Sequence, residues 1–67
     1  MHDTHHNKLT TLVTYWLEHN QEHRAEFREW ADKIAAEHAD AAEQLRLAAA
    51  KMAEADGFLV KARDLLQ

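Results

Sequence analysis

Apolar side chains recur along the first half of the chain with alternating spacings of three and four residues, which is typical of a helix that packs along one seam. The predicted seam consists of Leu9, Val13, Trp16, Asn20, His23, Phe27, Trp30 and Ile34. A second seam follows in Leu45, Ala48 or Ala49, Met52, Ala55, Leu59, Ala62 and Leu66. Large side chains in one seam and mostly small ones in the other can interdigitate. The pattern therefore predicts two helices that pack against each other.

The segment 36–40, AEHAD, separates the two patterns and is the predicted turn. Asp40 and Glu43 have the spacing of a capping box, with the aspartate as the cap of the second helix. We therefore expect helix one over about residues 8–37 and helix two over about residues 41–66.

Two helices of this length form an all-α, antiparallel helical hairpin over residues 8–67, preceded by a flexible arm at residues 1–7. Such a hairpin leaves a second set of apolar residues uncovered, namely Leu12, Leu17, Leu47, Phe58 and Leu65. A chain of 67 residues without cysteine has a small core, and a metal or self-association usually supplements it. We expect a homodimer in which two hairpins form a four-helix bundle. Gly57, the only glycine, marks a close approach, a kink or an interruption of helix two.

Composition excludes several classes of function. The net charge is -4, and a mildly acidic chain lacks the basic patch that binding to nucleic acid or an anionic membrane requires. No apolar run is long enough to span a membrane, and the first residues contain no apolar signal region, so a cytoplasmic location is expected by elimination. Neither serine nor cysteine occurs, and no motif points to a small-molecule substrate. We therefore expect no enzymatic activity.

The candidate chemistry is a pair of histidines, His19 and His23, four residues apart on one helix. This spacing places two imidazoles on the same face, about 6 Å apart along the axis, where they can chelate one transition metal ion. Glu22 and Glu26 each follow one of these histidines by three residues and are further candidate ligands. Asn20 stands where the zinc-protease motif H-E-x-x-H has glutamate, so protease chemistry is not supported.

A metal site needs three or four ligands, so the second helix or a second chain must contribute. A turn near residue 39 brings His23 opposite Glu54 and Ala55, which makes Glu54 the plausible third ligand and Asp56 a weaker one. Alternatively, a symmetric dimer brings two pairs of His19 and His23 together. Imidazole-rich sites suit Zn, Cu, Ni, Co or Fe, and the sequence does not choose among them.

The same residues also have a purely structural interpretation. Asn20 and His23 lie on the predicted seam and can form a buried polar layer that fixes register and oligomeric state. Trp16, Phe27 and Trp30 are then core residues. The protein is in that case a non-catalytic dimerisation or interaction module, whereas the metal interpretation makes it a protein for metal handling or sensing.

The remaining histidines lie at the ends of helix one. His2, His5 and His6 fall in the predicted arm, which is either without function or a weak metal-capturing tail. His38 falls near the end of helix one, where a protonated imidazole suits the helix dipole.

Part of helix one resembles a known family. The carrying residues are Trp16, His19, Asn20, His23, Phe27, Trp30 and Ala31. In this order they resemble small helical domains of unknown function with a core of the type YWxxHNxxHxxxFxxWA, which often follow histidine-rich segments. The resemblance extends from Leu12 to about Leu66. It implies a helical hairpin and a link to nickel or cobalt handling.

Overall fold

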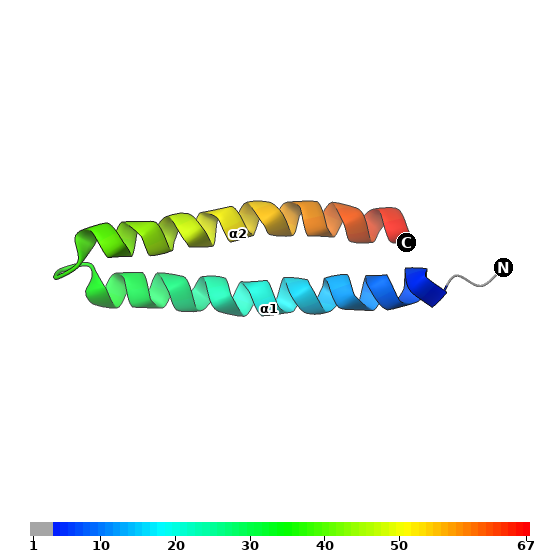
Figure 1. The fold of residues 1–67 in the computed structure, drawn as a ribbon, viewed down its shortest axis with the longest axis horizontal. Helices are drawn as coiled ribbons and strands as arrows, with labels where there is room; N and C mark the ends of the chain where they lie inside the picture. The colour runs from blue at the N-terminus through cyan, green and yellow to red at the C-terminus, as the bar shows by residue number, and fades with distance from the viewer. Residues whose placement is uncertain (1–3) are drawn as a thin grey trace.

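The computed structural model describes the backbone of residues 4–67 and the side chains of residues 5–67, and it consists of two helices and a turn. Helix α1 spans Thr4–Ile34 and helix α2 spans Ala39–Leu66. They lie side by side and antiparallel, so both termini are at the end opposite the turn (Figure 1). At 1.5 Å per residue, the 31 residues of α1 and the 28 residues of α2 give helices about 46 and 42 Å long. The predicted all-α helical hairpin is confirmed, and the described residues contain no strand.

The helix boundaries differ from the predicted ones at both ends of α1. The helix begins at Thr4, so residues 5–7 are helical where a flexible arm was expected, and residues 1–3 lie outside the described part. It ends at Ile34, whose carbonyl oxygen accepts hydrogen bonds from the backbone N–H of Glu37 at 3.1 Å and of His38 at 2.7 Å. These two bonds close the turn, and the helix ends three residues earlier than predicted.

The start of α2 also differs from the prediction. His38 occupies the N-cap position, and its side chain makes no capping hydrogen bond. Asp40 was expected to cap the helix, but this was wrong because α2 begins at Ala39 and includes the aspartate in its first turn. A carboxylate there still favours the positive end of the helix dipole.

The face of α1 that packs against α2 is displaced from the predicted seam. Its buried and half-buried residues follow the spacing Thr10, Val13, Leu17, Asn20, Arg24, Phe27, Ala31 and Ile34. Trp16 and Trp30 were predicted in this seam, but they are 40% and 56% exposed. Their places are taken by the residues that follow them in the chain. Each replacement lies about 100° around the helix from the predicted residue.

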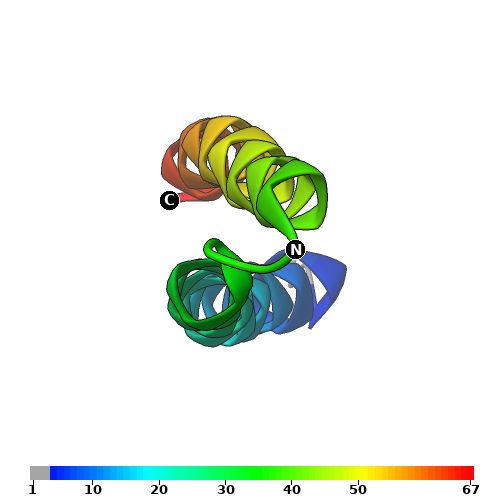
Figure 2. The same cartoon turned by 90° about the vertical axis from the view of Figure 1, so that its left-hand side faces the viewer.

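Small side chains account for the close packing of the two helices. Ala31, Ala42 and Ala49 are almost completely buried, and among residues 5–67 no large side chain is fully buried. The seam of α2 runs through Ala42, Leu45, Ala49, Met52, Asp56, Leu59, Arg63 and Leu66. It therefore contains Asp56 and Arg63 where Ala55 and Ala62 were predicted. Seen from the turn, the helices are inclined to each other, so their ends far from the turn lie on opposite sides of the view (Figure 2).

One polar cluster interrupts the seam, and we call it the Asp56 clasp. Asp56 is only 8% exposed. Asn20 Nδ2 donates to Asp56 Oδ1 at 3.0 Å, and Arg24 Nη2 lies 3.2 Å from Asp56 Oδ2. A carboxylate so little exposed to water is costly unless its oxygens are paired. The clasp therefore favours the rotation of α1 that turns Arg24 inward, where the predicted seam had His23.

Other ion pairs lie on the surface. Arg46 Nη2 approaches Asp32 Oδ1 at 2.9 Å and joins the helices near the turn. Lys33 Nζ lies 3.2 Å from Glu29 Oε1, one helical turn away on α1. Exposed pairs contribute little to stability. Within residues 4–67, neither helix is long and apolar enough to cross a membrane.

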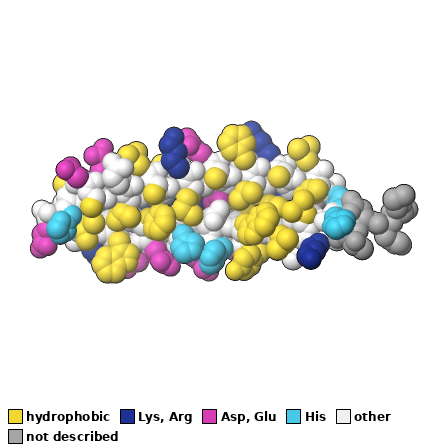
Figure 3. Space-filling view, viewed as in Figure 1, with side chains coloured by type: hydrophobic (Ala, Val, Ile, Leu, Met, Phe, Trp, Pro, Cys, Tyr) yellow, Lys and Arg dark blue, Asp and Glu magenta, His cyan; other side chains and the backbone are white. Residues whose placement is uncertain are grey.

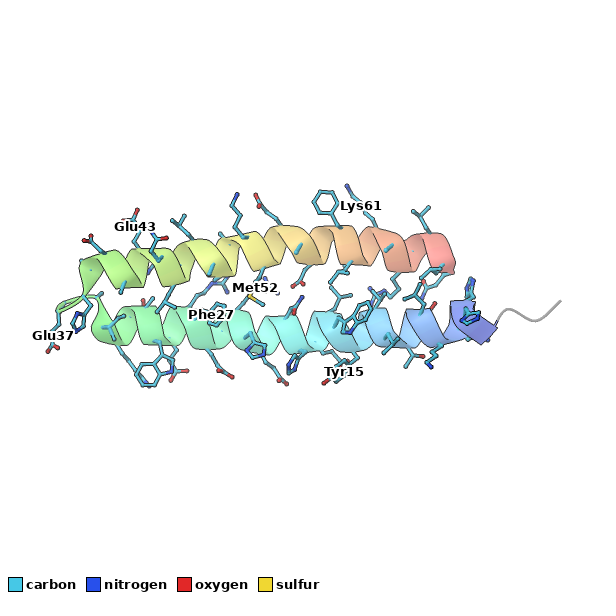
Figure 4. All side chains as sticks on the ribbon, viewed as in Figure 1. Tyr15, Phe27, Glu37, Glu43, Met52 and Lys61 are labelled. Carbon is cyan, nitrogen blue, oxygen red and sulfur yellow. The ribbon has the colours of Figure 1, made fainter. Side chains whose placement is uncertain are left out.

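The clasp predicts a large effect of one isosteric substitution. Asp56→Asn removes the charge that faces Arg24, and we expect the free energy of unfolding to fall by about 1–3 kcal/mol. Urea denaturation followed by circular dichroism measures the change. Glu43→Gln is the matched control, because Glu43 is exposed and points away from α1 in Figure 4. An equal effect of the two substitutions would contradict a special role for the clasp.

Gly57 predicts a stabilising substitution. Helix α2 continues through this residue without interruption, and a Cβ atom added there meets no atom within 4 Å. Gly57→Ala should raise the free energy of unfolding by about 0.5–1 kcal/mol, because alanine has the higher helix propensity. Ala50→Gly, at an exposed position of the same helix, should lower it by a similar amount. A loss of stability in Gly57→Ala would instead indicate that another chain approaches the glycine closely.

Candidate functional site

The imidazole rings of His19 and His23 converge on the outer side of α1. Their Nε2 atoms are 3.1 Å apart. The ring centroids are 4.5 Å apart, and the planes are nearly perpendicular at 88°. Because the residues are one helical turn apart, their side chains project from the same face. The structure therefore brings together the two histidines that the sequence singled out.

Aromatic rings flank the histidine pair on both sides. The Tyr15 ring is stacked on His19 with a centroid distance of 5.6 Å, and Phe27 lies 6.2 Å from His23. The four residues follow one another at intervals of four, so each ring is turned by about 40° around the helix relative to the one before. Tyr15 accordingly points away from α2, whereas Phe27 lies between the helices near Met52 (Figure 4). These neighbours restrict the orientations open to both imidazoles.

The separation of the two nitrogens suits a shared metal ion. With metal–nitrogen bonds of about 2.0–2.1 Å, the observed 3.1 Å corresponds to a nitrogen–metal–nitrogen angle of about 100°. That value lies between the right angle of square-planar or octahedral sites and the wider tetrahedral angle. The distance between the two nitrogens is therefore compatible with one ion held by both imidazoles.

The same contact is a hydrogen bond in the metal-free protein. Of the two Nε2 atoms, one must donate a proton and the other must accept it. This contact requires at least one neutral ring, since a fully protonated imidazole has no acceptor. A metal ion held by both nitrogens would displace the proton of this hydrogen bond.

The carboxylates predicted as further ligands lie in different environments. Glu22 and Glu26 are exposed on α1. Glu54 Oε2 pairs with Lys51 Nζ at 3.3 Å. It also lines a surface depression with Gly57, Phe58 and Lys61, the last of which points away from α1 (Figure 4). Among the described residues, no three or more histidine and acidic side chains are placed to hold a metal.

Asp56, the weaker candidate ligand, is engaged in the clasp by Asn20 and Arg24. Asp56 and Glu54 are two residues apart, so they lie on nearly opposite sides of α2. Within the described residues, the hairpin therefore brings two imidazole nitrogens together and adds no third ligand-type side chain to them.

The other histidines are apart from this pair in the chain. His5 and His6 belong to the first turns of α1, and His2 lies outside the described residues. His38 is at the turn, at the start of α2. His23 is half-buried but is not a member of the polar layer in the seam, which contains Asn20, Arg24 and Asp56.

A row of large, mostly exposed side chains runs along α1, and we call it the outer stripe; Leu9, Trp16 and Trp30 of this row were predicted in the buried seam. Its residues are Leu9, Leu12, Trp16, His19, His23 and Trp30. Their spacings are three, four, three, four and seven residues, and Glu26 occupies the position between His23 and Trp30. In Figure 3, histidine side chains (cyan) near the middle of α1 interrupt a row of hydrophobic side chains (yellow). The outer stripe could have been recognised in the sequence, because large apolar residues lie on both sides, around the helix, of the line through Val13 and Asn20.

Comparison with known proteins places the chain in a family. Residues 9–66 match the family described as Domain of unknown function (DUF8180). An uncharacterized protein of Archaeoglobus fulgidus is 42% identical over 59 residues, which is 88% of this chain and 95% of that protein. No solved structure matches the chain. The resemblance to a small helical family of unknown function is confirmed, while the specific residue pattern stays a prediction. The chain belongs to the DUF8180 family.

Proposed function

We propose that the protein binds a divalent transition metal ion of the Ni, Co, Zn or Cu class through His19 and His23. The observation that carries the proposal is the 3.1 Å separation of the two Nε2 atoms. Imidazole nitrogen is a preferred ligand for all four metals. The flanking rings of Tyr15 and Phe27 favour this arrangement before the metal arrives, which lowers the entropic cost of binding.

The role that fits such a site is metal handling or sensing rather than catalysis. A pair of histidines on one helix fills only part of a coordination sphere and leaves positions open for ligands from elsewhere. The chain contains neither serine nor cysteine, the usual acyl-transfer nucleophiles. Glu22 and Glu26 lie on the same helix as the pair and remain candidates for additional, weaker ligands.

The proposal predicts loss of binding when the pair is removed. In isothermal titration calorimetry with Ni, Co, Cu and Zn, His19→Ala/His23→Ala should bind at least one of these metals at least tenfold more weakly than its parent. The parent should carry His2→Ala, His5→Ala and His6→Ala, so that histidines near the N-terminus do not contribute.

His38→Ala in the same parent is the control, since His38 lies at the turn. It should leave the affinity unchanged. Undiminished binding in the double variant would exclude the site. Circular dichroism of every variant checks that the helices are intact.

Coordination through imidazole nitrogens predicts that the metal affinity depends on pH. Metal affinity should fall as the pH is lowered from about 7.5 to about 5.5, because protonated imidazoles cannot coordinate. Titrations at three pH values, with the double variant as the blank, measure the effect. A pH-independent affinity would point to carboxylate ligands instead of the histidine pair.

A second candidate function is a metal-independent helical interaction module. The exposure of the outer stripe favours it, because large exposed apolar surfaces on small proteins often mark interaction sites. In this version the polar layer within the hairpin is the Asp56 clasp, and His23 is only part of the contact surface. A self-association that chelators do not affect would support this candidate over metal binding.

A further inference from the structure

The geometry points to a second copy of this chain as the source of the missing ligands: we propose that two hairpins pack antiparallel along their outer stripes. Four imidazoles, two from each copy, then surround one metal ion. The inference rests on the proposed function, because it completes the same site. It also specifies which face of the hairpin forms the expected four-helix bundle.

The outer stripe exposes more large apolar surface than a small hairpin with an alanine-rich seam should leave in water. Leu9, Leu12, Trp16 and Trp30 are 40%, 37%, 40% and 56% exposed. Tyr15, beside the stripe, is 56% exposed. Among residues 5–67, the buried apolar side chains of one hairpin are those of Val13 and three alanines. Covering the stripe would bury side chains of a size that the hairpin itself does not bury.

The order of residues along the stripe fits a two-fold axis. Antiparallel helices related by such an axis beside residue 21 place Leu12 opposite Trp30 of the second copy, and His19 opposite His23 of the second copy. Both Leu12–Trp30 contacts are then apolar, one on each side of the histidine layer. The stripe supplies both members of the Leu12–Trp30 and His19–His23 pairs, whereas Trp16 lies opposite Glu26 of the second copy, just outside the stripe.

The chemistry of the site selects a second copy over a different partner. One hairpin offers two nitrogens, and Zn and Cu sites commonly use three or four ligands. The symmetric contact supplies two more imidazoles with the same spacing. No carboxylate from α2 is required, which agrees with the positions of Glu54 at the outer surface and Asp56 in the clasp. The expected stoichiometry is one ion for two chains.

Sedimentation velocity and elemental analysis of the full chain test the proposal. With Zn or Ni added, the protein should sediment as a dimer that holds one ion. With chelator, the dissociation constant of the dimer should rise at least tenfold, and the protein should shift toward monomer. Trp30→Glu should weaken both dimerisation and metal binding at least tenfold, although His19 and His23 are unchanged. Phe58→Glu is the matched control, because Phe58 is 70% exposed on α2 and outside the stripe.

Cysteine cross-linking tests the register, and the chain has no cysteine of its own. A mixture of Leu12→Cys chains and Trp30→Cys chains should form a disulfide-linked heterodimer in the presence of metal. Leu12→Cys alone should not cross-link, because its two copies would be about 27 Å apart along the axis. Self-cross-linking of Leu12→Cys would indicate a parallel dimer and overturn the proposed arrangement.

The outcomes separate this inference from the proposed function. One ion bound per monomer, with no change in sedimentation, overturns the shared site and leaves metal binding by the pair intact. A dimer that binds no metal and persists in His19→Ala/His23→Ala overturns both and supports the interaction module. A dimer whose metal binding and assembly are equally impaired by Phe58→Glu and Trp30→Glu places the interface elsewhere and overturns the stripe contact.

Discussion

The pairing of Asp56 with Asn20 and Arg24 is the interaction on which the rest of this hairpin depends. Alanines at the seam let the helices approach closely. Their side chains are too small to interdigitate in only one way, so they do not fix the rotation of a helix about its axis. A buried carboxylate is different, because each misplaced partner leaves a charge without compensation. By requiring both Asn20 and Arg24 on the inner face, the clasp sets the rotation of α1 about its axis.

The functional surface follows from that rotation. Once Arg24 is directed inward, the residue before it is directed toward the edge of the interface, and His23 comes to lie beside His19 on the outer side. The same rotation exposes Trp16 and Trp30. A single ionic contact between the helices thus determines which side chains the protein presents to its surroundings. The histidine pair owes its accessibility to a contact on the neighbouring face of the helix.

The helices, their order and the antiparallel hairpin could be predicted from the sequence, because seams with three- and four-residue spacing and no proline leave few alternatives. The histidine pair was also predictable, since it lies within one helix. The rotation of α1 was not. Residues at 9, 16, 23 and 30 and residues at 10, 17, 24 and 31 satisfy the same periodicity with Val13 and Phe27. The choice between these two sets depends on the contact between Asn20 and Asp56. The two residues are 36 positions apart, so the contact cannot be read from the local sequence pattern.

The turn and the two termini lie at opposite ends of the hairpin, and this indicates the order in which its contacts form during folding. The turn and the Asp32–Arg46 pair close a short loop, whereas contacts near the termini require nearly the whole chain to be ordered. Assembly is therefore expected to proceed from the turn toward the open end, with the clasp formed about midway. Opening in the native state should proceed in reverse, so amide protons near Thr10 and Leu66 should exchange earlier than those near Ala31 and Ala42. The histidine pair lies near the middle of this gradient, at the level of the clasp, because Asn20 and Arg24 directly follow His19 and His23 in the chain.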